Sequence, residues 1–286
     1  MSPDYQVAAL WIGGKLSFLE ELCLKSFVDA GHHTILFTYE GTENVPDGVE
    51  VRDGSEILPN PNVMRHTRTG SPALFSDLFR YKMLERMNRT IWVDTDAYCC
   101  KPFVTETGHF HAYEKKNEIN GGVLGLPKDS KTLRALLDFT ADVHAIPPWF
   151  SADERQRLEA AGATGAPVHA ADMPWGVWGP HALTHFLNAT GEVEHSMPSV
   201  ALYPVSYSER KLLTQPGADL GAYITDETFS IHLYGRRMRP RISEKFGGVP
   251  RPRSLIGKLL KKHGVDPTLN PLPDRTLAVV TDGDDD

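Results

Sequence analysis

The sequence predicts an α/β fold: a single Rossmann-like domain with a mostly parallel central sheet flanked by helices. Residues 7–12 form an apolar run that ends at two glycines, which is typical of a buried strand followed by a tight turn. In residues 17–30, apolar side chains recur at helical spacing until Gly31 ends the pattern, and residues 34–39 then indicate a second strand. A strand, a helix and a strand in this order indicate a parallel crossover connection.

The next elements lead to a short strand. Residues 42–70 are rich in Pro, Gly, Asn and Asp, so we expect a loop with at most one short strand there. Ser71 is a candidate N-cap, and Pro72 is a candidate first residue of a helix that continues to residue 87. Residues 91–93 are then an apolar strand, and its carboxyl end lies at the edge where open α/β sheets bind ligands.

The remaining elements alternate between strands, helices and loops. We expect a glycine-rich strand at residues 119–127, a helix at 131–144 and an excursion at 147–174 that carries one polar helix. A further helix is expected at residues 180–188, a strand or loop at 228–234, and a basic amphipathic helix at 254–263.

The composition is that of a globular protein that does not bind nucleic acid. Hydrophobic residues make up 41% and charged residues 23% of the chain, which is enough apolar material for a full core. The formal net charge is −7, whereas binding to nucleic-acid phosphates requires a basic face. Three cysteines do not indicate a disulfide framework, and no apolar run approaches the roughly 20 residues of a spanning helix. We therefore expect a cytoplasmic protein.

Asp94 and Asp96 are the first candidate site residues. In an extended strand, side chains at i and i+2 face the same side, so the two carboxylates converge while Thr95 faces away. Two converging carboxylates form a hard oxygen site of the kind that binds Mn²⁺ or Mg²⁺ together with water and substrate phosphates. A polar turn after a strand is the alternative interpretation of so short a motif.

Four further polar residues have patterns that leave two interpretations open. Asp77 and Arg80 lie three residues apart on one helical face, so they form either a surface ion pair or a pair that holds a sugar ligand. His232 is one of 12 histidines, most of which are expected to be surface or packing residues. Asn120 either binds sugar hydroxyls or caps a turn beside two glycines.

The order of several short motifs resembles that of a known family. The motifs are WIGG, SDLFRY, IWVDTD, NGG and HLY, at residues 11–14, 76–81, 91–96, 120–122 and 232–234, with shorter matches at residues 26–27, 31–32, 101–102, 179–180 and 183–184. This order is similar to that of glycosyltransferase family 32, whose members carry an Asp-x-Asp (DXD) motif and include capsule-synthesis and globoside-type transferases. The resemblance spans about residues 7–235, and the shared order is more specific than any single motif.

The resemblance implies a fold and an activity. The fold is GT-A, and the reaction is the metal-dependent transfer of a hexose from a nucleotide-diphosphate sugar, with uridine as the expected base and with retention at the transferred carbon. The relatives also imply a glycan or lipid-linked acceptor in surface polysaccharide synthesis.

The resemblance further implies roles for the polar candidates. Asp94, Asp96 and His232 would hold the Mn²⁺ or Mg²⁺ ion, with Asp94 also contacting the ribose. Asp77 and Arg80 would contact the donor sugar and its pyrophosphate. The expected catalytic residues are Asp77, Arg80, Asp94 and Asp96.

The remaining expected donor contacts surround this group. Trp11 and Trp92 would lie beside the nucleoside, and Tyr234, which stands where the family often has Trp, would reach the glycosidic oxygen or the phosphate. Lys245 or another late basic residue would stabilise the diphosphate. The other donor-binding positions are Thr95, Asn120 and Gly121.

The domain organisation follows from the same comparison. Residues 1–246 are predicted to form the catalytic domain, with residues 147–175 as a candidate acceptor lid. Residues 247–275 would form a C-terminal basic helix and extension, and residues 276–286 a disordered acidic tail. Because residues 251–263 place apolar side chains on one face and basic ones on the other, this helix either packs on the core or lies on anionic lipid at the inner membrane face.

Two other functions remain as alternatives. A haloacid dehalogenase-like phosphohydrolase also places Asp-x-Asp after a strand, but that pattern requires Thr or Val where this chain has Tyr98. A non-catalytic module that binds a nucleotide sugar or a glycan is the second alternative.

Overall fold

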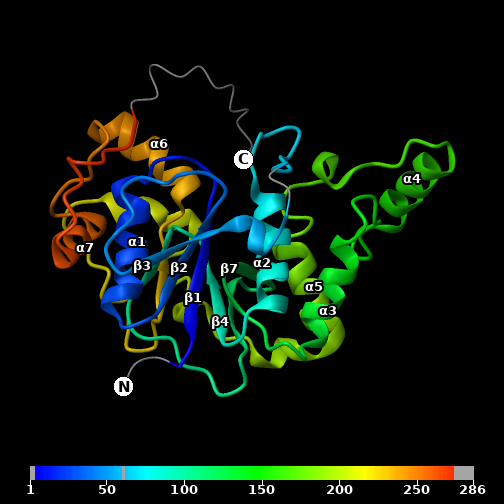
Figure 1. Ribbon diagram of the computed structural model, residues 1–286, viewed down its shortest axis with the longest axis horizontal. Coiled ribbons are helices and arrows are strands. Elements are labelled where there is room, and N and C mark those ends of the chain that lie inside the picture. Colours follow the sequence, from blue (N-terminus) through cyan, green and yellow to red (C-terminus); the bar gives the residue numbers. More distant parts are fainter. Residues whose placement is uncertain (1–3, 60–61, 274–286) are drawn as a thin grey trace.

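A six-stranded sheet with the order β3-β2-β1-β4-β7-β6 forms the centre of the protein (Figure 1). The computed structural model describes residues 4–59 and 62–273, so the predicted acidic tail lies outside the described residues. The four strands from β3 to β4 run parallel, and β7 and β6 are antiparallel to their neighbours. The strands are β1 (Gln6–Trp11), β2 (Thr34–Thr38), β3 (Val49–Asp53), β4 (Thr90–Val93), β6 (Phe110–Lys115) and β7 (Glu118–Gly125).

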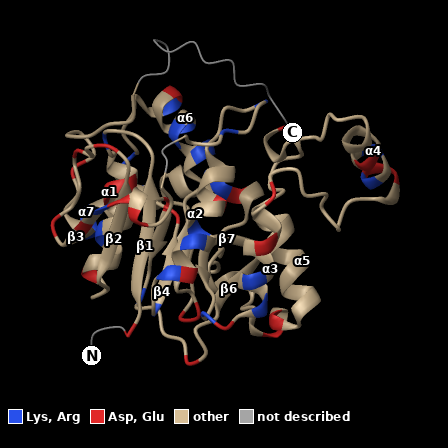
Figure 2. Ribbon diagram, turned by 45° about the vertical axis from the view of Figure 1, so that its right-hand side comes forward, with Lys and Arg blue, Asp and Glu red and all other residues tan. Residues whose placement is uncertain are grey.

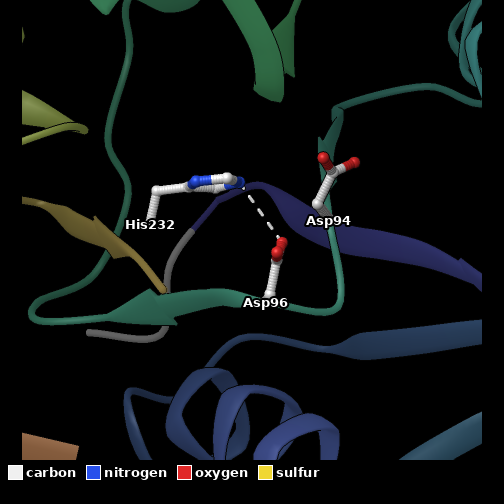
Figure 3. A group of neighbouring side chains, drawn as sticks. All are labelled: Asp94, Asp96 and His232. Carbon is white, nitrogen blue, oxygen red and sulfur yellow. Dashed lines mark ion pairs between the residues drawn. The ribbon is translucent and has the colours of Figure 1, made fainter. Parts of the chain in front are cut away.

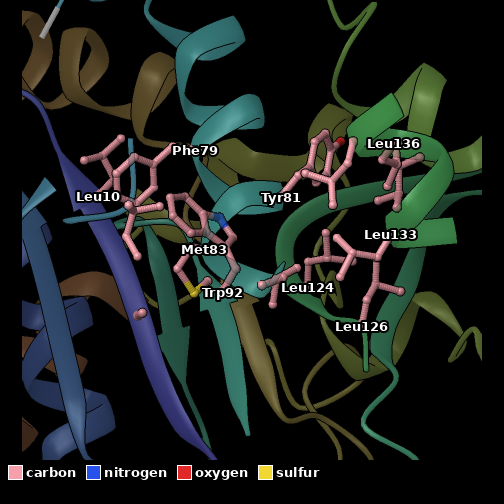
Figure 4. Close-up of a cluster of buried hydrophobic side chains, with 14 of the residues drawn as sticks. Leu10, Phe79, Tyr81, Met83, Trp92, Leu124, Leu126, Leu133 and Leu136 are labelled. Carbon is pink, nitrogen blue, oxygen red and sulfur yellow. The ribbon is translucent and has the colours of Figure 1, made fainter. Parts of the chain in front are cut away.

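Helices cover both faces of this sheet, as the predicted fold class requires (Figure 1). Alternate residues of a strand point to opposite faces. Ala8 and Leu10 of β1 therefore join a core cluster with side chains of α2, α3 and α5 (Figure 4), while Val7 and Ala9 join a second cluster with side chains of α1. These helices are α1 (Phe18–Asp29), α2 (Ala73–Arg86), α3 (Lys131–Thr140) and α5 (Pro180–Thr190).

Most of the predicted elements are present with shifted ends. The hydroxyl of Ser17 caps α1, and Glu20 completes a capping box by accepting from the Ser17 backbone N–H. Ser71 is not the N-cap of α2, because Pro72 occupies that position; the Ser71 hydroxyl still accepts from the Ala73 N–H at 3.3 Å. α3 ends at Thr140, four residues earlier than predicted.

A second, two-stranded sheet lies beside the main one. β5 (Ala97–Cys99) pairs antiparallel with β8 (Ser230–His232), with Ala97 opposite His232. β8 lies within the strand or loop expected at residues 228–234, whereas β5 and the pairing were not predicted, because a strand of three residues is too short to show a periodic pattern. The pairing joins the segment after β4 to the C-terminal third of the chain.

The C-terminal helices pack on α1. α6 (Gly235–Phe246) and α7 (Leu255–His263) bury Met238, Ile242, Ile256 and Leu260 in one core cluster with α1 side chains. His263 of α7 bonds to Asp29 of α1, with 2.6 Å between Nδ1 and Oδ2. The apolar face of α7 therefore contacts the body of the protein, and among the described residues no helix has the length and apolar character needed to span a bilayer.

The predicted excursion forms an arm. It carries α4 (Ala152–Ala163), a helix without a buried residue that projects from the body (Figure 1). The base of the arm is anchored, since Trp149 packs against Phe139 and Phe186 with ring centroids 5.1 and 6.1 Å apart. That residues 147–175 act as an acceptor lid stays a prediction.

His111 of β6 should make the stability of the fold depend on pH. Its side chain is fully buried, and its pKa is lowered to about 4, first by burial and then by the neighbouring His109. An unfolded histidine titrates near pH 6.5, so this stabilisation is present above pH 6.5 and is lost as the pH falls towards 4. We expect wild type to lose about 2 kcal/mol more unfolding free energy than His111→Phe between pH 7 and pH 5, measured by urea unfolding.

The exposed His33 provides the matched control for this measurement. His33→Gln should keep the wild-type loss between the two pH values. If His111→Phe lost as much stability as wild type, burial of a neutral His111 would not be the cause.

Candidate functional site

A tight turn carries Asp94 and Asp96. β4 ends at Val93, and the N–H of Ala97 donates to the carbonyl of Asp94 at 2.9 Å. The extended backbone expected through these residues is therefore wrong. The turn is held against β7 because the N–H of Asp94 donates to the carbonyl of Gly122 at 2.7 Å.

The pairing of β5 with β8 brings His232 to the turn. The N–H of Leu233 donates to the carbonyl of Asp96 at 2.8 Å, which extends the ladder past Ala97 and His232. The His232 Nε2 then lies 3.3 Å from Asp96 Oδ1. Figure 3 shows the side chains of Asp94, Asp96 and His232 gathered around one point.

These three side chains fit a divalent metal ion. One ligand atom from each lies within 4.8 Å of the other two. Carboxylate oxygens are the donors that Mn²⁺ and Mg²⁺ prefer, and a histidine nitrogen is an acceptable ligand for Mn²⁺. The two carboxylates would also offset the charge of a dication. The group therefore matches the predicted metal site, and the identity of the ion stays a prediction.

Asp96 is held as a carboxylate by the groups around it. Burial alone would raise its pKa, but the charge and hydrogen bond of His232, the charge of Arg239 and the Gly235 N–H hold the pKa well below its ordinary value. That N–H donates to Asp96 Oδ2 at 2.6 Å. For His232 burial alone would lower the pKa, but the negative charges of Asp96 and Asp94 raise the pKa of His232 to about 9.

Arg80 is fixed between two carboxylates. Its guanidinium lies 3.3 Å from Asp77 Oδ1 and 3.2 Å from Asp94 Oδ1, and its side chain is only 7% exposed. Asp94 Oδ1 also accepts from the Trp92 indole N–H at 2.7 Å. Burial raises the pKa of Asp77 to about 7 against the opposing charge of Arg80. The surface ion pair considered for Asp77 and Arg80 is therefore a buried one.

Glycines of β7 leave room for these side chains. A Cβ on Gly121 would lie 2.3 Å from an Arg80 Nη1, and one on Gly122 would lie 3.3 Å from Asp94 Oδ2. The side chain of Asn120 forms two hydrogen bonds within the sheet. Its oxygen accepts from the Gly122 N–H of the same strand at 2.8 Å, and its amide donates to Glu114 of β6 at 2.8 Å. Asn120 thus supports the strand, and its contact with a donor stays a prediction.

A pocket of about 1100 Å³ opens beside the two aspartates at the carboxyl ends of β1 and β4. Seven of the candidate site residues named in the sequence analysis line it, namely Trp11, Arg80, Trp92, Asp94, Thr95, Asp96 and Lys245. Five others are not among its lining residues, namely Asp77, Asn120, Gly121, His232 and Tyr234. The roles of all these residues towards a donor stay predictions.

Tyr234 supports His232. Its backbone is left-handed, with φ of 51°, and its hydroxyl donates to the carbonyl of Val205 at 2.8 Å. Its ring stands edge-on to the His232 ring, with centroids 4.6 Å apart. The hydroxyl is thus engaged by Val205, and the contact of Tyr234 with the glycosidic oxygen or phosphate stays a prediction.

The basic wall of the pocket was missed by the sequence analysis except for Lys245, which was named as a candidate contact of the diphosphate. It comes from α6 and from a 3₁₀ segment (Tyr207–Thr214), neither of which was predicted. Pro240 inside α6 and the glycines after it looked like loop signals. Three basic residues spaced by four, Arg237, Arg241 and Lys245, were the available sign of a helix with a basic face.

Comparisons with known proteins add little to this geometry. No protein-family model matches the sequence, and no curated protein matches it. A solved structure of a transferase mutant is similar to this chain with a TM-score of 0.37 and 11% sequence identity, over 66% of this chain and 92% of that chain. Likeness at this level shows neither a family nor an activity.

Substitution of the metal ligand Asp96 should weaken the affinity for the metal ion, which can be measured without any substrate. We expect wild type to bind one Mn²⁺ and Asp96→Asn to bind it at least about tenfold more weakly, because one of two charged ligands is lost. Electron paramagnetic resonance of free Mn²⁺ measures this. Asp138→Asn on the exposed face of α3 is the matched control and should bind as wild type does. Equal affinity of both variants would exclude this site.

A methyl group on Gly121 should disturb Arg80. Because Arg80 is held on both sides, it cannot move away freely, and we expect Gly121→Ala to cost about 1–3 kcal/mol of unfolding free energy. Gly162→Ala on α4 meets no atom within 4 Å and should be neutral or stabilising by up to about 1 kcal/mol. Thermal unfolding of the two variants tests this, and an unaffected Gly121→Ala would contradict the close contact.

Proposed function

We propose that this protein is a metal-dependent glycosyltransferase that transfers a hexose from a nucleotide-diphosphate sugar, with UDP as the expected nucleotide. The acceptor would be a glycan or a lipid-linked saccharide in surface polysaccharide synthesis, and the transfer would proceed with retention. The observation that carries the proposal is the convergence of Asp94, Asp96 and His232 beside Arg80, at the edge of a large pocket that Arg80 and both aspartates line.

The position of the pocket supports a nucleotide substrate. In open α/β sheets, ligands bind at the carboxyl ends of the strands, and the pocket is lined there by Trp11 at the end of β1 and by Asp94 after β4. The Trp11 indole nitrogen is buried without a partner among the described residues, so it is available to a ligand. The order of motifs that resembles glycosyltransferase family 32 leads to the same class of substrate.

The residues present suit the departure of a diphosphate. Asp94, Asp96 and His232 would hold Mn²⁺ or Mg²⁺, which when bound supplies positive charge to the leaving diphosphate. Arg80 adds a guanidinium whose direction is set by Asp77 and Asp94, so little reorganisation is needed when charge develops. Asp77 therefore acts through Arg80, as a positioning residue.

The carboxylates of the pocket favour retention without a protein nucleophile. Among the described residues, the pocket is lined by the carboxylates of Asp94, Asp96 and Glu244. The first two are engaged by Arg80 and His232, and Glu244 lies beyond the second turn of α6. We infer that the acceptor hydroxyl attacks the sugar carbon from the side of the leaving group. The bond to the diphosphate breaks, its electron pair leaves with the diphosphate, and the acceptor proton passes to a diphosphate oxygen.

Hydrolysis of the donor provides the test. Incubated with UDP- and GDP-sugars and Mn²⁺, wild type should release the nucleoside diphosphate from one donor, and chelator should stop the release. We expect Asp96→Asn to be slower by at least about a hundredfold, because the metal no longer stabilises the leaving group. Asp138→Asn should match wild type. Chromatography of the nucleotides measures the release.

Two results would replace the proposal. Donor binding without any cleavage, unchanged in Asp96→Asn, would indicate a non-catalytic binding module. Release of phosphate from simple phosphomonoesters, with no cleavage of a nucleotide sugar, would indicate a phosphohydrolase in which Asp94 is the nucleophile.

A further inference from the structure

The pocket is far more basic than the chain as a whole. Nine Lys and Arg side chains and three Asp and Glu side chains line it among the described residues, whereas the chain has a net charge of −7. Figure 2 marks several of the basic positions on α6. Arg80 and Arg239 are already paired with carboxylates, so the positive charge available to a second anionic ligand has to come from other basic residues of the lining.

The excess charge extends away from the metal site. The first residue of α6, Gly235, is bonded to Asp96. A helix rises 1.5 Å per residue, so Lys245 lies about 15 Å further along the axis of α6, and Arg241 about 9 Å. A second hollow of about 510 Å³ shares Arg241 and Lys245 with the pocket and adds Arg251. We call Arg241, Lys245 and Arg251 the basic tract.

Two cations of the basic tract have no carboxylate partner in the described part of the chain. Within the described residues, neither Arg241 nor Lys245 forms an ion pair, and the Arg241 Nε–H donates to the hydroxyl of Thr214 at 3.1 Å. By contrast, Arg239 on another face of α6 donates to Glu20 at 2.8 Å. Like charges four residues apart destabilise a helix, so Arg241 and Lys245 are unfavourable to the protein alone. A bound anion would remove that cost.

The second hollow has an aromatic side chain in its lining. This is Phe246, and the guanidinium groups of Arg241 and Arg251 lie 5.9 and 5.2 Å from its ring centroid. The tract thus combines an aromatic ring with flanking cations. Because the hollow shares Arg241 and Lys245 with the pocket, a saccharide strand with charged substituents can extend from one into the other.

We propose that the basic tract binds the acceptor, and that the acceptor is an anionic saccharide with phosphate or carboxylate groups along its length. This inference rests on the proposed glycosyltransferase function. The acceptor would lie along α6 and present a hydroxyl at the end of the pocket where Asp94 and Asp96 stand. Lys245 then serves the acceptor in place of the diphosphate contact expected from the sequence.

Binding of defined oligosaccharides to the full chain tests the tract. The probes are a hexamer of galacturonic acid, a phosphodiester-linked mannose oligomer and neutral maltohexaose, and calorimetry measures binding without metal. We expect one or both anionic probes to bind, more weakly as salt is added, and the neutral probe not to bind. Arg241→Gln/Lys245→Gln should weaken the affinity at least about tenfold, because two charged hydrogen-bond donors are lost.

A matched pair of cations outside the tract provides the control. Lys116→Gln/Lys131→Gln removes the same charge from two exposed positions that line neither hollow, and this variant should bind as wild type does. Equal weakening in both double variants would show that only net charge matters and would overturn the proposal. Equal binding of maltohexaose and the anionic hexamer would also overturn it.

Two further measurements separate this inference from the proposed function. Vesicles of phosphatidylglycerol that bind through Arg241 and Lys245, with no binding of either anionic oligosaccharide, would assign the tract to a membrane surface and overturn the saccharide proposal. Donor hydrolysis by wild type is followed in the same preparations. Hydrolysis without oligosaccharide binding overturns the tract alone, whereas binding without hydrolysis of any donor overturns the glycosyltransferase and with it the acceptor role.

Discussion

The site depends on one constraint, which is that two carboxylates are largely buried just after the end of β4. Asp94 and Asp96 are 29% and 15% exposed, and an incompletely solvated charge has to be met by opposite charge or by hydrogen bonds. Each neighbouring element contributes one such group. α2 supplies Arg80, β8 supplies His232, and the start of α6 supplies the Gly235 N–H. The surrounding fold therefore has to bring three distant parts of the chain to one turn.

The same constraint explains the small residues nearby. A guanidinium can lie between Asp77 and Asp94 only if β7 has no side chain at Gly121. Gly179 meets a similar requirement, since a Cβ there would lie 2.9 Å from Asp77 Oδ2. The glycines of this region are thus required by close approach to charged side chains, and the packing around the site permits few substitutions.

Local patterns predicted β1, β2, β4 and β7 of the main sheet and most of its helices, whereas β6 was not predicted. The polar residues Asp94, Asp96, Arg80 and His232 could also be found, since their motifs occur in a recognisable order. The contacts that bring them together could not. β5 and β8 are too short to show a period, and their pairing is a long-range contact that no local propensity specifies. α6 was not predicted because it contains Pro240, which removes a backbone hydrogen bond from a helix. The burial of Met238 and Ile242 offsets this loss of stability.

The ladder between β5 and β8 also sets when the site can form during synthesis. Ala97 meets His232 only after the intervening chain has left the ribosome, and closing so long a loop costs entropy before the contact stabilises anything. The parallel part of the sheet, from β3 to β4, can fold earlier because its strands are close in sequence. A nascent chain that stops before β8 would carry two aspartates with one of their cationic partners absent. The site can therefore form only after residue 235 has been synthesised, and a chain released earlier would lack both His232 and the Gly235 N–H beside Asp96.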